Sequence, residues 1–209
     1  MAVLSRRSIH DRLALPITDQ GSLVVTPILD RDEVFDSDSL DLRLGCYFLL
    51  PKTPPQAYLH PGSHPSEHSN LRVHIPIRKY LVVPAHQTVL GATLEFVKLP
   101  YDVSGQILTK SSVARTFIVI ETAPWIHPNY RGCLTLEIAN VSNTPVLLYP
   151  GLPIAQLILM TVDGAEPPSV LKGTYFGPVY PEPPPPKNLR SQFSRIGIDN
   201  PAVIPGPDT

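Results

Sequence analysis

The sequence predicts a mainly β fold, and three observations carry that prediction. It holds 26 prolines in 209 residues, well above the usual share of about 5%, which disfavours long helices. Short apolar runs separated by turn residues recur along most of the chain, as in all-β domains. No helical pattern of about 10–15 residues separates those runs, so a parallel α/β sheet is disfavoured.

Composition and length indicate one globular domain and a tail. Apolar residues make up 43% and charged residues 17%, which is typical of a folded chain. We assign residues 1–162 to the domain and 163–209 to a Pro-rich C-terminal arm or tail. Pro183 to Pro186 are consecutive and favour extended polyproline geometry. The tail is expected either to lie over the body or a neighbouring subunit, or to be a disordered end.

The charge balance limits the partners. The net charge is −1, so no basic excess exists for binding a polymeric nucleic acid. No apolar run approaches a membrane span and no signal segment is present. We therefore expect a protein that is soluble and cytoplasmic and that binds neither a membrane nor a nucleic-acid polymer. Cys46 and Cys133 lie far apart and are expected to be buried, reduced thiols.

The order and spacing of apolar and polar residues predict a helix and two strands in the first 45 residues. Residues 1–15 are predicted to form a helix, capped by Ser5 and stopped by Pro16. Residues 23–28 read as a short strand. Residues 39–45, SLDLRLG, alternate leucine with polar residues, which predicts a strand with the leucines on one face and the polar set on the other.

A polar, Pro-rich loop insertion is predicted at residues 52–72. Its His60, His64 and His68 have helical spacing, but Pro61 and Pro65 interrupt any helix, so we expect a solvated insertion rather than a metal site. Further short strands are predicted within 73–99, at 146–148 and within 154–162.

The stretch at residues 104–140 carries the candidate chemistry. Lys110, Ser111, Ser112 and Arg115 place two cations and two hydroxyls within six residues. A guanidinium offers a fork of donors that matches phosphate oxygens, and serine hydroxyls add further contacts. The cluster is therefore a candidate phosphate site, although such a cluster is also typical of a solvated turn.

Glu137 is the candidate acid–base residue. It lies among Leu134, Leu136 and Ile138, and an apolar wall would raise the pKa of its carboxyl toward the range useful for general acid–base work. The alternative is a carboxylate that simply points outward from an alternating strand.

Two familiar chemistries lack their motifs. Zinc nucleobase deaminases need H-x-E with P-C-x-x-C, which two isolated cysteines cannot supply, so we expect no zinc. A phosphate loop of the form G-x-x-x-x-G-K-[ST] is also missing, because no glycine directly precedes Lys110.

Four ordered segments resemble the dCTP deaminase branch of the dUTPase-like superfamily. They are Thr109-Lys110-Ser111-Ser112-Val113-Ala114-Arg115, Thr122-Ala123-Pro124-Trp125-Ile126-His127-Pro128, Leu136-Glu137-Ile138-Ala139-Asn140 and Pro150-Gly151-Leu152-Pro153-Ile154-Ala155-Gln156-Leu157. The resemblance implies a dUTPase-like distorted β-barrel, also called a β-clip, with a short N-terminal helix. It also implies a homotrimer with active sites between subunits.

The resemblance also implies roles. Glu137 would activate water for attack at C4 of cytosine, with Ser111 and Arg115 as the other catalytic residues. The nucleotide would be held by a wider set, and Mg²⁺ would bind through the phosphates of the nucleotide. That set is Lys110, Ser111, Ser112, Arg115, His127, Thr135, Leu136, Glu137, Gln156 and Tyr175.

The chain departs from the family pattern at several positions. His127 replaces an aspartate that contacts the sugar, and Lys110 replaces an arginine. Thr116-Phe117 follows Arg115 where the family has a glycine. In the tail, Thr174 and Pro178 flank the position of Tyr175 and replace a lysine and a glutamine. Recognition of the sugar and the phosphates is therefore expected to differ from that of the family.

The resemblance implies a deaminase that converts dCTP, or a closely related cytosine nucleotide, to dUTP without zinc, with or without release of pyrophosphate to give dUMP. Two alternatives remain open at this point. One is a dUTPase-like pyrophosphatase, and the other is a non-catalytic nucleotide-binding regulatory relative.

Overall fold

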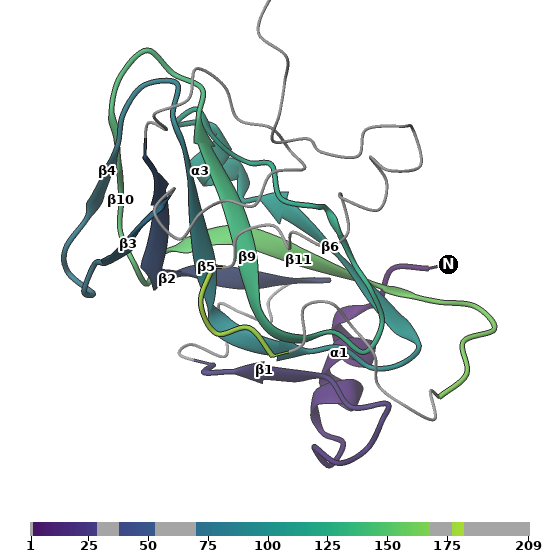
Figure 1. The fold of residues 1–209 in the computed structure, drawn as a ribbon. Helices are drawn as coiled ribbons and strands as arrows, with labels where there is room; N and C mark the ends of the chain where they lie inside the picture. Colours follow the sequence, from purple (N-terminus) through teal and green to yellow (C-terminus); the bar gives the residue numbers. More distant parts are fainter. Residues whose placement is uncertain (1, 29–37, 53–69, 168–176, 182–209) are drawn as a thin grey trace, which may run out of the picture.

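The computed structural model describes residues 2–28, 38–52, 70–167 and 177–181, and it is mainly β (Figure 1). The helices are α1 (Arg6–Leu13) and the single turn α3 (Ser111–Ala114). The strands are β1 (Val24–Thr26), β2 (Ser39–Pro51), β3 (Asn70–His74), β4 (Leu81–Val83), β5 (Thr88–Lys98), β6 (Val103–Thr109), β7 (Ile118–Ile120), β8 (Trp125–Ile126), β9 (Arg131–Asn140), β10 (Val146–Leu148) and β11 (Pro153–Thr161).

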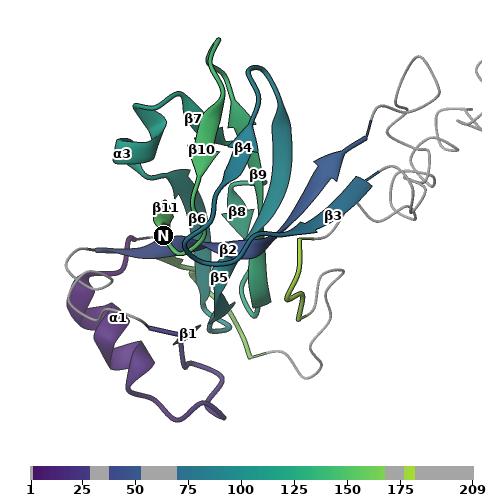
Figure 2. The ribbon, with the colours of Figure 1, turned by 90° about the vertical axis from the view of Figure 1, so that its left-hand side faces the viewer.

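Most strands join one curled sheet. Its order is β7-β9-β5-β2-β11-β6-β8, with β1 added to β5 and β3 added to β2, while β4 and β10 form a separate ribbon. The pairing register shifts in the middle of β2 and of β5, and such irregularities let long strands bend around a core. In both views α3 and α1 lie toward opposite ends of this sheet (Figures 1 and 2). The predicted mainly β fold with a short N-terminal helix is confirmed.

The N-terminal helix is shorter than predicted. Ser5 caps it as expected, since its hydroxyl accepts the N–H of Ser8 at 3.3 Å. The residues before the cap are extended, because the N–H of Leu4 donates to the carbonyl of Leu159 at 2.8 Å and Val3 forms a β-bridge with Met160. Pairing with β11 thus takes the first residues away from the helix.

The strand predicted at residues 39–45 is the first part of β2, and its leucines Leu40, Leu42 and Leu44 are at most 1% exposed. The polar face is also covered, since Asp41 and Arg43 are 8% and 4% exposed. Both form ion pairs, Asp41 with Lys110 and Arg43 with Glu95. The alternation therefore separates two buried faces rather than a buried face and a wet one.

The predicted insertion is shorter than residues 52–72. Residues 70–72 begin β3, which pairs antiparallel with the end of β2, because the last residues of β2 would otherwise leave their backbone groups on an open edge. The rest of the loop, with its three histidines, lies outside the described residues.

Part of the C-terminal arm lies on the body. The N–H of Gly177 donates to the carbonyl of Arg131, and the N–H of Cys133 donates to that of Pro178, both at 2.7 Å. A side chain at Gly132 would come within 2.4 Å of the Pro178 ring. This segment therefore fits only because Gly132 has no Cβ.

Both cysteines are free thiols in the structure. Cys133 is buried as expected, whereas Cys46 is only half-buried. Burial, and then the charge of Glu95, raise the pKa of the Cys133 thiol. Among the described residues, no helix has the length and apolar character needed to cross a membrane.

Candidate active site

The cationic cluster lies on α3, at the end of β6. Lys110 is the N-cap of this turn, and its carbonyl accepts the N–H groups of Val113 and Ala114 at 2.9 Å. Ser111, Ser112 and Arg115 are all exposed. Within the described part of the chain, no hydrogen bond or ion pair occupies the Arg115 guanidinium. Two hydroxyls and a guanidinium are therefore presented together to solvent, as a phosphate site requires.

Lys110 and Gln156 meet at a third side chain, Asp41. The ammonium of Lys110 forms an ion pair with Asp41 Oδ2, and Gln156 Nε2 donates to Asp41 Oδ1 at 3.3 Å. These residues come from different elements, because Gln156 on β11 lies directly opposite Asp41 on β2. Lys110 and Gln156, two predicted site residues that are distant in the sequence, thus lie close together in the fold.

A groove of about 450 Å³ lies along α3. Lys110 and Ser112 of the cluster line it, and most of its apolar wall comes from β10, the turn before β11 and the start of β11. The lining residues are Leu44, Lys110, Ser112, Val113, Thr116, Val146, Leu147, Leu148, Tyr149, Leu152, Pro153 and Ile154. The groove has the size of a small-molecule site.

Glu137 lies on β9, opposite Leu90 of β5. The expectation that Leu134, Leu136 and Ile138 form an apolar wall around Glu137 is wrong, because side chains alternate along a strand. Leu134, Leu136 and Ile138 are buried on the core side, whereas Glu137 is exposed on the other face.

The direction of the expected pKa shift nevertheless holds. Desolvation by the surrounding atoms, and then the charge of Glu121, raise the pKa of the Glu137 carboxyl. Glu121 follows β7, and its backbone N–H donates to the carbonyl oxygen of Glu137 at 2.8 Å. The pKa of the Glu137 carboxyl is therefore shifted toward the range in which the group can both accept and return a proton.

Strand β7 connects the two halves of the site. Ile120 of β7 lies opposite Ile138 of β9, and its N–H donates to the Thr109 hydroxyl, directly before Lys110, at 2.8 Å. No hydrogen bond or ion pair among the described residues joins Glu137 itself to Ser111 or Arg115. A single chain therefore places the acid and the cationic turn on neighbouring elements without closing a site between them.

The remaining predicted residues are spread around these two centres. His127 is exposed in the turn between β8 and β9. The carbonyl of Thr135 accepts the Thr122 hydroxyl at 2.8 Å. Leu136 is fully buried, so its backbone alone can face a ligand. Tyr175 lies outside the described residues.

Sequence reasoning missed Asp41 and Glu121. Asp41 stands in the SLDLRLG run, where alternation suggests a wet polar face. A cross-strand partner can be identified only from the register of β2 against β11. Glu121 has no local signal, because its effect on Glu137 depends on the pairing of β7 with β9.

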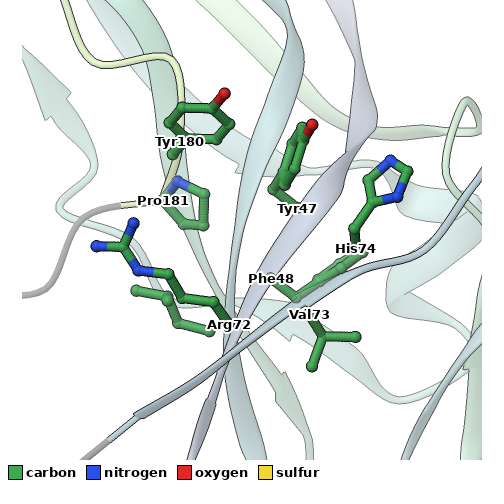
Figure 3. A pocket seen from close by; sticks show the side chains of 8 residues that line it. Tyr47, Phe48, Arg72, Val73, His74, Tyr180 and Pro181 are labelled. Atoms are coloured by element: carbon green, nitrogen blue, oxygen red, sulfur yellow. The ribbon is translucent and has the colours of Figure 1, made fainter. Parts of the chain in front are cut away.

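A second hollow, of about 370 Å³, lies on the β2–β3 side and contains none of the predicted site residues. Figure 3 shows Tyr47 lying between His74 and Tyr180, with ring centroids 4.8 and 4.7 Å away. Arm residue Tyr180 thus packs on the body beside this hollow. Within the described ranges, no group of three or more His, Cys, Asp or Glu side chains is placed to hold a metal ion.

Comparison with known proteins identifies the family. The model of the dCTP deaminase-like family matches residues 3–162. The "dCTP deaminase, dUMP-forming" of Dictyoglomus thermophilum is 35% identical over 156 residues, covering 74% of this chain and 78% of that protein. The "dCTP deaminase" of Halorubrum lacusprofundi is 34% identical over 203 residues, covering 94% and 92%.

The fold has a solved counterpart. The crystal structure of 2′-deoxycytidine 5′-triphosphate deaminase from Agrobacterium tumefaciens aligns with a TM-score of 0.55 and 23% identity. The alignment covers 75% of this chain and 47% of that longer chain. The family match and the shared fold leave one assignment: the chain belongs to the dCTP deaminase-like family.

Proposed function

We propose that the protein deaminates dCTP, with Glu137 as its general base. The observation that carries the proposal is the position of Glu137 on β9, where desolvation and Glu121 raise the pKa of its carboxyl. Relatives named as dCTP deaminases, at 35% and 34% identity, support the same reaction.

In the proposed reaction, the Glu137 carboxylate accepts a proton from a water molecule as the water oxygen attacks C4 of cytosine. The same carboxyl then returns the proton to the leaving amine, so ammonia departs, and transfer of the second water proton from the new oxygen to N3 gives the uracil ring. A carboxyl with a raised pKa suits this proton transfer, because a pKa nearer the operating pH lets the group both accept a proton from water and donate it to the amine. The proposed step uses no zinc.

The cationic turn would hold the nucleotide. Ser111 and Arg115 would position the water and stabilise the charge that develops near it, and Arg115 with Ser112 would contact the nucleotide. Their exposure on α3 leaves them free to do so. Gln156 and the backbone of residues 135–136 would line the base and sugar pocket. Mg²⁺ would bind through phosphate oxygens, which are hard ligands suited to it.

We infer that a neighbouring copy completes the site, in a homotrimer. In one chain the acid and the turn are both exposed, and no hydrogen bond or ion pair among the described residues joins Glu137 to Ser111 or Arg115. Next to the turn, the β4–β10 ribbon exposes an apolar face on which Val82 lies opposite Leu147. Beside them, the ring centroids of Tyr80 and Tyr149 lie 5.7 Å apart. These four side chains are 39–51% exposed, and covering such a face would favour association.

A dUMP product is the second candidate outcome. Relatives at 35% identity are named "dCTP deaminase, dUMP-forming", which favours release of pyrophosphate after or together with deamination. The alternative product is dUTP, which the name of the Halorubrum relative leaves open.

A nucleotide panel separates these possibilities. Purified protein with Mg²⁺ would be incubated with dCTP, CTP and dUTP, and the products would be separated by chromatography. Conversion of dCTP to dUTP or dUMP with ammonia release supports the proposal. Hydrolysis of dUTP without any deamination would identify a pyrophosphatase instead, and binding without turnover would identify a regulatory relative.

A further inference from the structure

Lys110 is attached to the sheet on two sides. Its backbone N–H donates to the carbonyl of Ile154 on β11 at 3.0 Å. Its ammonium, on a side chain that is 25% exposed, forms an ion pair with Asp41 of β2. The residue that starts α3 is therefore fixed to two neighbouring strands.

Both carboxylate oxygens of Asp41 are occupied. Oδ2 contacts the Lys110 ammonium and Oδ1 accepts from Gln156 Nε2 at 3.3 Å. The Asp41 side chain is 10% exposed. A carboxylate buried to this degree costs free energy unless it is paired. Loss of its contacts with Lys110 and Gln156 would therefore be unfavourable, and this keeps both partners in place.

The arrangement has a consequence for each partner. The charge of Lys110 is compensated by Asp41. Its ammonium is therefore a weaker attractor for phosphate than the Arg115 guanidinium, which forms no ion pair with any residue that the structure describes. The amide of Gln156 is oriented, because a carboxylate accepts and cannot donate. Its Nε2 faces Asp41, which leaves Oε1 as an acceptor for a donor on a ligand.

We propose that Asp41 is a positioning residue of the nucleotide site. It holds Lys110, and with it the start of α3, and it fixes the amide orientation of Gln156. Lys110 then acts through α3 rather than as a phosphate ligand. The proposal rests on the proposed function, since it concerns the same site, and it transfers phosphate recognition to Arg115 and the two serines.

The test uses Asp41→Asn, Lys110→Met and the double variant. Asp41→Asn keeps the shape but removes the charge, and Lys110→Met keeps the length but removes the ammonium. The exposed residues Asp163 and Lys52 provide matched controls, Asp163→Asn and Lys52→Met. For each protein we would measure kcat with dCTP and the Kd values of dCTP and dCMP.

A positioning role predicts that each single variant lowers kcat by about 10- to 100-fold, as misplaced reacting groups do. The kcat of the double variant should be no lower than that of the single variants, because each substitution removes the same interaction between Asp41 and Lys110. The ratio of the dCMP Kd to the dCTP Kd should change by the same factor in both single variants, because either one loosens the turn that carries Arg115 and the two serines. The two control variants should match the wild type.

A different pattern would overturn the proposal. If Lys110→Met reduces that Kd ratio while Asp41→Asn does not, Lys110 is a phosphate ligand. If the two losses multiply in the double variant, the residues act independently. Should Asp41→Asn fail to fold, Asp41→Glu takes its place, because it moves the carboxylate away from Lys110 without touching the nucleotide. A positioning role predicts that its Kd ratio changes as that of Lys110→Met does, whereas a phosphate-ligand role predicts a change in Lys110→Met alone.

The proposed function can fail separately. A wild-type protein that binds dCTP but never deaminates it would refute the activity. The Kd ratios would then still decide between a positioning residue and a phosphate ligand. A wild-type protein that binds neither nucleotide would overturn both.

Discussion

The backbone N–H of Glu121 donates to the carbonyl oxygen of Glu137 at 2.8 Å, so two acidic residues lie side by side where β7 ends against β9. The negative charge of Glu121 disfavours ionisation of Glu137 and adds to the effect of desolvation in raising the pKa of Glu137. The proposed base is thus tuned by a residue that belongs to no recognisable motif.

Replacement of Glu121 by Gln should shift the pH dependence of the reaction. Without the neighbouring charge the pKa of Glu137 falls, so the carboxylate is ionised at lower pH. The acid limb of a kcat/KM profile should therefore move to lower pH. Glu166, exposed beyond β11, offers a control in Glu166→Gln. An acid limb that stays in place, or moves to higher pH, would contradict the assignment of Glu137.

How far the sequence predicts the structure depends on whether the signal is local. Ser5 marks the start of α1, although the helix ends at Leu13, before Pro16. The leucines of residues 39–45 identify the core side of β2. Alternation shows which residues share a face but not whether another element covers it. That is why the burial of Asp41 and Arg43 could not be predicted.

The same limit applies to the site. The motif segments predicted which residues to consider, and the structure does bring Lys110 and Gln156 together. The orientation of Glu137 away from its apolar chain neighbours depends on which face of β9 the core occupies. The contribution of Glu121 depends on a register between distant strands, which one sequence does not encode locally.

The buried ion pair between Arg43 and Glu95 should be essential as a pair. Arg43 Nη1 lies 3.2 Å from Glu95 Oε1, and the side chains are 5% and 1% exposed. Arg43→Met would leave a buried carboxylate without its cation, which should lower the free energy of unfolding by about 3–5 kcal/mol. Urea unfolding, followed by circular dichroism, measures this loss.

The double variant Arg43→Met/Glu95→Met serves as its control. Replacing both charges with apolar groups removes the uncompensated charge, so much of the lost stability should return. A double variant as unstable as the sum of two independent losses would show that the two residues do not act as a pair.

His127 should decide how the sugar is read. It is exposed in the turn before β9, where the family has an aspartate that can accept from the 3′-hydroxyl. Neutral imidazole accepts at one nitrogen only, and the protonated ring only donates. His127→Asp should therefore raise the preference for dCTP over its 2′,3′-dideoxy analogue by about tenfold, the value of one hydrogen bond to a charged group. An unchanged KM ratio would mean that His127 only packs within the turn.

Assembly should follow the exposed half-sites. Sedimentation at micromolar concentration should give a particle of three times 23.0 kDa. Leu147→Lys on the β4–β10 ribbon, where Leu147 is 44% exposed, should weaken that association, because a buried unpaired charge is costly. A wild-type monomer with full activity would contradict the shared site.

Deamination in H₂¹⁸O tests the central claim most directly. Wild-type protein and Glu137→Gln would be incubated with dCTP and Mg²⁺ in labelled water, and the products would be analysed by mass spectrometry. We predict that the wild type gives a uracil nucleotide with one ¹⁸O atom in the base, whereas Glu137→Gln keeps the fold and binds dCTP but forms no product. Labelled product formed by Glu137→Gln at the wild-type rate, or no uracil nucleotide from the wild type, would contradict the account.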